Sequence, residues 1–155
     1  MRPLRALGLT AVGAIAGFVA AGMLVKRAFP SAGDETSDEV TLVAVFDGIE
    51  LKSRASAFRG GSMLSWFGGI AVDLREAELA PDAHLRVMTA LGGIAIRLPA
   101  GTTVESKATA IAGGVDVAAP KPGTEDGPRL VLDGFALLGG IAVKADEPDA
   151  AEPAA

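Results

Sequence analysis

A short phrase recurs along the chain: an aromatic or aliphatic residue, a Gly-Gly or Asp-Gly pair, and then an apolar residue, any residue and a second apolar residue. The copies begin at positions 46, 67, 91, 112 and 132, with a doubled copy at 138, so the steps are 21, 24, 21 and 20 residues. Repeats of this period are typical of solenoid proteins, in which each repeat adds one unit to a stack. The glycines of the phrase, which we predict to be structural corners, are Gly48, Gly68, Gly69, Gly92, Gly93, Gly113, Gly114, Gly134, Gly139 and Gly140.

The glycine pairs separate short stretches that read as β-strands, because these stretches are apolar and often β-branched. Glycine accepts positive φ and lets another backbone pass close by, so a pair between two strands suits a corner. Coils of a β-solenoid lie about 4.8 Å apart, which leaves little room for side chains at a corner. We therefore predict an all-β, short single-domain β-solenoid with Gly-Gly corners. An antiparallel sandwich with Gly-rich hairpins is the alternative, although it would not need similar residues after every turn.

The first part of the chain predicts one N-terminal transmembrane helix. Residues 6–25 carry no charge, and Arg2, Arg5, Lys26 and Arg27 flank them. A helix of this length is roughly 30 Å long, the thickness of one bilayer core. A cleaved secretory signal is the alternative, but the apolar run continues past the best cleavage site to the basic pair. The basic residues at the two ends nearly balance, so the positive-inside rule leaves the side of the membrane undecided.

Three small residues in this segment, Gly13, Gly17 and Ala21, recur at every fourth position. Such spacing makes a flat helix face on which a second helix can pack closely. We interpret them as a possible helix–helix contact supporting a weak homodimer, with an incidental match in a Gly- and Ala-rich segment as the alternative.

Charge and composition divide the rest of the chain. All 19 acidic residues lie beyond position 27 together with 10 of the 14 basic ones, so this part carries a net charge of −9 and the first 27 residues carry +4. A surface with this much negative charge is a poor partner for nucleic acid or anionic lipid headgroups. The predicted organisation is a membrane anchor at 1–29, an acidic tether at 30–39, the folded domain at 40–146 and a disordered acidic tail at 147–155.

Catalytic groups are scarce. Cysteine is absent and His84 is the single histidine, so thiolate nucleophiles and Cys-based metal sites are excluded. No serine stands in a nucleophile-elbow sequence. The acidic cluster Asp73, Glu76 and Glu78 alternates with apolar residues and reads as a solvated strand and turn, with calcium binding as the alternative. We predict no catalytic, cofactor or metal site, and hence no enzyme.

The densest aromatic spot is Trp66-Phe67, directly before a glycine pair. Exposed tryptophan often anchors protein interfaces, so these two residues are a candidate partner surface. Packing at the corner is the alternative.

The run Phe67–Ala77 reads Phe-Gly-Gly-Ile-Ala-Val-Asp-Leu-Arg-Glu-Ala and follows Trp66. It is accompanied by Phe46–Gly48, by Leu91–Ile94 leading to Leu98–Gly101, and by Ile111–Val115. In this order the stretches resemble the C-terminal domain of the LiaF-like, cell-wall-active antibiotics response proteins, over about residues 40–143.

The resemblance implies a small β-solenoid of stacked strands at a bacterial membrane. In the best-known members it implies restraint of a two-component sensor system that responds to cell-envelope stress. Those members carry several membrane spans, whereas this chain has one candidate span. The resemblance supplies no catalytic motif.

The sequence thus predicts a non-enzymatic, single-pass protein of the bacterial cell membrane whose β-solenoid binds an unknown protein partner, such as a sensor kinase or another envelope protein. The alternative is a self-assembling structural scaffold of the bactofilin kind, in which coils stack end to end. Charge and proline at Lys144–Pro148 should protect the last coil against such stacking, whereas Val40–Val45 is less protected.

Overall fold

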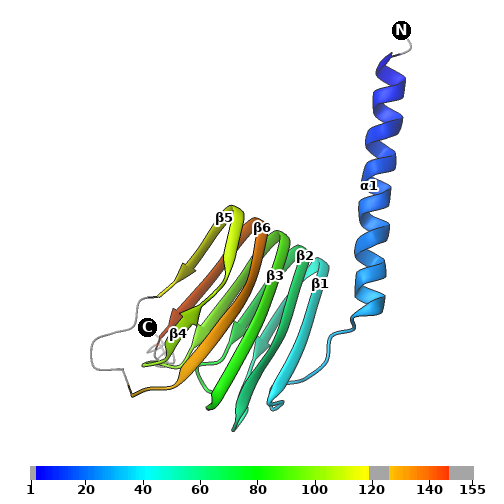
Figure 1. Cartoon of the computed structure of the whole chain (residues 1–155). Helices are drawn as coiled ribbons and strands as arrows, with labels where there is room; N and C mark the ends of the chain where they lie inside the picture. Colours follow the sequence, from blue (N-terminus) through cyan, green and yellow to red (C-terminus); the bar gives the residue numbers. More distant parts are fainter. Residues whose placement is uncertain (1–2, 119–125, 147–155) are drawn as a thin grey trace, which may run out of the picture.

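The computed structural model describes residues 3–118 and 126–146 of the chain, so the predicted disordered tail at 147–155 lies outside the described residues. One helix precedes six strands (Figure 1). The elements are α1 (Pro3–Ala28), β1 (Glu39–Lys52), β2 (Phe58–Asp73), β3 (Leu79–Leu98), β4 (Thr103–Ser106), β5 (Thr109–Val117) and β6 (Arg129–Ala145).

The strands form one six-stranded sheet in which every strand-to-strand pairing is parallel. The all-β prediction is therefore confirmed, and the antiparallel sandwich is wrong. The repeats are also in register: Gly69 pairs with Gly93, Gly93 with Gly140, and Gly140 with Gly114. Equivalent positions of five copies of the phrase thus form rows that run across the sheet, whereas in the copy that begins at 132 Asp133 and Gly134 pair with Arg86 and Val87 and lie outside the glycine rows.

The long strands bend near their middles, so the sheet wraps into two layers (Figure 1). Side chains alternate along each half, as expected for strands with one buried face. Leu85 and Val87 point into the core from the first half of β3, and Ile94 and Ile96 do so from the second. The core therefore lies between the two layers, and the outer faces remain for contacts.

The spatial order of the strands is β1, β2, β3, β6, with β4 and β5 beside β6 at the far end. The C-terminal strand is thus an internal strand. To the core it contributes large apolar residues such as Leu130, Leu132 and Ile141, which are fully buried. β5 offers the smaller Ala110, only half buried, and occupies the end of the stack.

This order corrects the expectation about the last coil. Lys144 lies near the end of β6, an internal strand, and protects no sheet edge. The edge at that end of the sheet belongs to β4 and β5, which pair only with β6 within the described residues.

At the opposite edge of the sheet, the first half of β1 is covered by the segment before it. Ala32 and Thr41 exchange two backbone hydrogen bonds of 2.7 Å. The N–H of Val43 donates to the Ser31 hydroxyl at 3.0 Å, and the N–H of Val45 donates to the Asp47 carboxylate at 2.8 Å. The predicted acidic tether at 30–39 is therefore held against β1 through Ser31 and Ala32, and Val40–Val45 is better protected than the sequence suggests.

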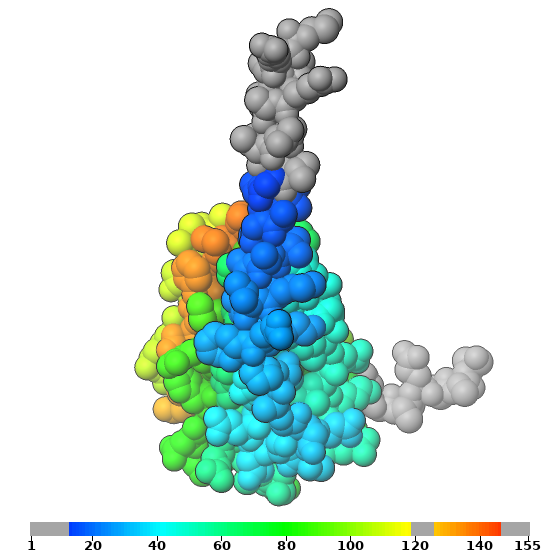
Figure 2. Space-filling view, turned by 90° about the vertical axis from the view of Figure 1, so that its right-hand side faces the viewer, coloured from blue at the N-terminus to red at the C-terminus, as the bar shows by residue number. Residues whose placement is uncertain are grey.

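The C-terminal half of α1 packs beside β1 (Figure 2). The helix continues past the bent ends of the strands (Figure 1). Among the residues described, the structure contains no helix that is both long and apolar enough to cross a membrane.

Candidate functional site

The two glycines of each pair occupy different environments. A Cβ on Gly92, which has φ +140°, would overlap the carbonyl oxygen of Gly68 on the neighbouring strand. A Cβ on Gly93 would find its nearest neighbour, the Gly140 carbonyl oxygen, at 3.7 Å. In the Gly-Gly pairs, close backbone approach thus requires glycine only at the first position. The same overlap with a neighbouring strand occurs at Gly68, Gly113 and Gly139, whereas Gly69, Gly114 and Gly140 have room for a Cβ. The two Asp-Gly pairs differ from each other: Gly48 has room for a Cβ, and a Cβ on Gly134 would overlap the Val87 carbonyl oxygen.

A second line of close contacts escaped the sequence analysis. Gly60 and Gly61 have positive φ, and a Cβ on them would overlap the carbonyl oxygens of His84 and Val40 respectively. The pair does not belong to the recurring phrase, because no apolar-x-apolar triplet follows it, although the Gly-Gly dipeptide itself was a usable signal.

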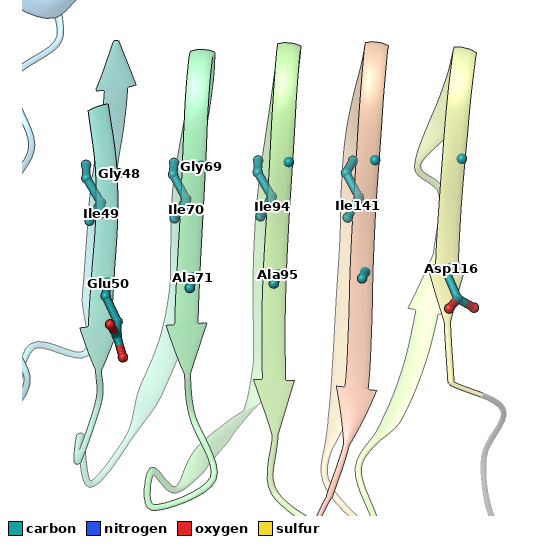
Figure 3. Close-up of a pocket in the computed structure, with 14 residues that line it drawn as sticks. Gly48, Ile49, Glu50, Gly69, Ile70, Ala71, Ile94, Ala95, Asp116 and Ile141 are labelled. Atoms are coloured by element: carbon teal, nitrogen blue, oxygen red, sulfur yellow. The ribbon is translucent and has the colours of Figure 1, made fainter. Parts of the chain in front are cut away.

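The second glycines line a shallow trough on one outer face of the sheet (Figure 3). The trough has a volume of about 850 Å³. Its floor consists of two rows, one of glycine and one mostly of alanine, and each row takes one residue from every long strand and from β5. The floor residues are Gly48, Gly69, Gly93, Gly140 and Gly114 in the first row and Glu50, Ala71, Ala95, Ala142 and Asp116 in the second.

Carboxylates close both ends of the alanine row. Glu50 lies on β1 and Asp116 on β5, and both side chains are exposed (Figure 3). Four strand spacings separate them, which corresponds to about 19 Å. The trough is therefore apolar along its length and negatively charged at its two ends.

The small residues of the trough floor are not explained by packing of the fold. Glycine inside a strand is less favourable than alanine by roughly 0.5–1 kcal/mol, and the second glycines have space for a side chain. A flat floor without side chains lets another molecule approach the backbone closely. The arrangement is suited to binding an elongated partner across the strands.

The predicted partner surface Trp66-Phe67 lies against the chain's own helix. The Phe18 ring stands 5.3 Å from that of Trp66 and 6.0 Å from that of Phe67, and Phe46 completes the cluster at 6.1 Å from Phe18. Phe46 has φ 57°, which is unusual for a bulky residue and accompanies a register shift in β1. Phe67 keeps 48% of its surface exposed, so the cluster is only partly covered.

An ion pair fastens the same junction. The Lys26 ammonium lies 2.6 Å from the Asp47 carboxylate, and this hydrogen bond lowers the pKa of Asp47 below its usual value. α1 approaches β1 through Gly22, where a Cβ would lie 2.9 Å from Val45 Cγ1.

Two of the three residues of the predicted helix–helix contact take no part in this packing. A Cβ on Gly13 or Gly17 would meet nothing within 4 Å, and Ala21 is half buried. Gly13 and Gly17 therefore remain open to a second helix, whereas Ala21 is partly covered, and the helix–helix contact stays a prediction.

The acidic cluster is organised by arginines. Arg75, whose side chain is 8% exposed, donates to both carboxylate oxygens of Asp73, and this hydrogen bonding lowers the pKa of Asp73. Glu76 pairs with Arg54 at 3.0 Å. Within residues 3–118 and 126–146 no group of three or more acidic, histidine or cysteine side chains could hold a metal ion.

No protein-family model matches the chain, and neither the curated proteins nor the solved structures contain a significant match. The resemblance to LiaF-like domains accordingly stays a prediction from the residues that carry it.

Proposed function

We propose that this chain is a non-enzymatic, membrane-anchored β-solenoid module that binds a protein partner in its trough. In this proposal each bent strand is one coil, and β4 with β5 makes the terminal coil. The observation that carries it is the row of second glycines, which leave the trough floor bare where the fold has room for side chains.

The charge pattern of the trough specifies the partner segment. An apolar floor with Glu50 and Asp116 at its ends favours an apolar segment about 19 Å long with a basic residue at each end. The resemblance to LiaF-like domains suggests a cell-envelope or signalling protein, including a sensor kinase, as its source.

Membrane attachment in this proposal rests on residues 6–25, which are free of charge and bounded by basic residues. A bacterial cell membrane is the location that the resemblance implies. A single span provides less regulatory surface than the several spans of LiaF-type proteins, so partner binding through the trough is the role we transfer.

A bactofilin-like scaffold is less well supported. Head-to-tail stacking needs two open edges, and the N–H groups of Thr41, Val43 and Val45 on β1 already have acceptors within the chain. The edge of β4 and β5 is unpaired within the described residues, which favours at most a pairwise contact.

Photocrosslinking in bacterial membranes tests the proposal. A photoreactive amino acid at Ala95 lies on the trough floor, and the matched control at Arg86 lies on the same strand but on the other outer face. Ala95 should give one defined adduct, mapped by mass spectrometry to an apolar segment bounded by basic residues. Reversing both end charges, with Glu50→Lys and Asp116→Lys, should reduce the yield. Equal adducts from Ala95 and Arg86, or adducts unaffected by charge reversal, would contradict the trough as the binding site.

A further inference from the structure

The bent ends of the strands form an exposed apolar ridge that none of the arguments above uses. We define the apolar ridge by Phe46, Phe67, Leu137, Leu138 and Ile111, which are 40%, 48%, 41%, 48% and 68% exposed. They lie on β1, β2, β6 and β5, and the half-buried Leu91 of β3 pairs with Phe67 and Leu138 between them, so the ridge crosses the whole sheet. Scattered exposed apolar residues are normal in soluble proteins, whereas a continuous row along one edge marks an interaction surface.

The bent parts of the strands, where the apolar ridge lies, carry almost no charge. The aligned segments 64–70, 88–94, 135–141 and 109–115 contain no charged residue, and 43–49 contains only Asp47. That carboxylate is paired with Lys26 at 2.6 Å. The remaining charges of the strands lie nearer their ends, for example Glu105 and Arg129, at the opposite end of the molecule from the ridge.

α1 runs alongside β1 towards the ridge (Figure 1). α1 passes the ridge where Phe18 contacts Trp66, and its N-terminal part continues beyond the bent strands (Figure 1). The helical residues before Phe18 extend about 22 Å past this contact, at 1.5 Å per residue. This length is shorter than a hydrocarbon core of about 30 Å. If the ridge is immersed by about 5–10 Å, as is typical of interfacial apolar surfaces, the immersed part of the helix adds most of the missing length.

We propose that the apolar ridge lies in the interface of the lipid bilayer that holds α1, so that the domain contacts the membrane through its bent strand ends. This inference rests on the membrane attachment in the proposed function. Apolar side chains beside an uncharged helix fit acyl chains and zwitterionic headgroups, and Trp66 occupies the level at which tryptophan favours the membrane interface. The trough then lies directly below the membrane surface, where it meets the juxtamembrane segment of a partner.

Single cysteines test the ridge, because the chain has none of its own. The full chain carries one fluorescent label. It is attached either at Ile111→Cys, on the ridge strand farthest from α1, or at the control Glu105→Cys on β4, at the opposite end of the molecule from the ridge. Each is reconstituted in phosphatidylcholine vesicles and separated by flotation. Brominated phosphatidylcholine should quench the Ile111 label at least about twofold more than the Glu105 label, because bromines near the headgroups reach only labels within the roughly 10 Å interfacial layer. Iodide should quench the two labels in the reverse order.

Leu137→Glu combined with Leu138→Glu provides the matched perturbation, since both side chains are exposed and their replacement leaves the core intact. The charged variant should still float through α1, while its Ile111 label becomes as accessible to iodide as the control label. Circular dichroism verifies that its β-structure is unchanged.

The outcomes separate the two proposals. A chain that floats with its Ile111 label open to iodide overturns the ridge contact and leaves the anchored module standing. A label that is shielded from iodide yet insensitive to brominated lipid shows a second protein copy on the ridge and overturns the lipid contact. A chain that does not float overturns both membrane attachment and the ridge contact.

Discussion

Gly92→Ala and Gly93→Ala change neighbouring residues and should have opposite effects on stability. Alanine at position 92 must adopt a φ near +140° and would overlap the Gly68 carbonyl oxygen. The backbone strain costs about 1–3 kcal/mol, and each ladder hydrogen bond lost as the strands separate costs about 1 kcal/mol more. We expect Gly92→Ala to lower the free energy of unfolding by about 3–5 kcal/mol in total.

Alanine at position 93 projects over the trough, with its nearest neighbour at 3.7 Å. It should be neutral or raise the free energy of unfolding by up to about 1 kcal/mol, because alanine restricts the unfolded chain more than glycine does. At about 4–8 °C per kcal/mol for a domain near this size, the two melting temperatures should differ by more than about 12 °C.

Thermal unfolding of the full-length variants, followed by circular dichroism in one detergent solution, measures this difference. Gly139→Ala and Gly140→Ala repeat the comparison on β6, where the environments are again an overlap and a free space. Equal melting temperatures within either pair would refute the assignment of close approach to the first glycine alone.

Three further outcomes follow from the structure. The pKa of Asp73 lies below its usual value of 3.8 because Arg75 donates to the carboxylate. This pair therefore stabilises the folded state above pH 3.8 and loses its effect as the pH falls through the lower folded-state pKa. Asp73→Asn should make thermal stability less dependent on pH in that acidic range, and an unchanged dependence would contradict the pairing. Removal of residues 30–39 should cause self-association in light scattering, because it frees the N–H groups of Thr41 and Val43, and a monomeric deletion variant would show that the cap is unnecessary. EDTA should leave the melting temperature unchanged, and a fall would reveal a metal site.

The recurring phrase was sufficient to predict an all-β domain and the alignment of its glycine pairs, because in-register parallel strands place equivalent residues side by side. It could not predict the strand order. β5 and β6 both carry Gly-Gly followed by apolar-x-apolar, and only the larger core residues of β6, such as Leu130 and Ile141, favour the internal position.

The candidate site was predictable only in part. Sequence identity cannot distinguish Gly92 from Gly93, since the difference arises from which backbone carbonyl each faces. Phe18 carried no periodic signal linking it to Trp66, because their contact joins a helix to a strand distant in sequence. The trough likewise depends on rows that exist only once the strands are stacked.

The trough, the ridge and both sheet edges all depend on the order of the strands. Spin labels on paired cysteines measure it directly, with one label at Glu50→Cys and the second at Asp116→Cys or Ala142→Cys, all in the same row. The order β1, β2, β3, β6, β5 predicts four strand spacings, about 19 Å, to position 116 and three, about 14 Å, to position 142. Electron paramagnetic resonance should therefore give the longer distance for the Asp116 pair. A longer distance for the Ala142 pair would mean that the coils stack in sequence order and would contradict the account.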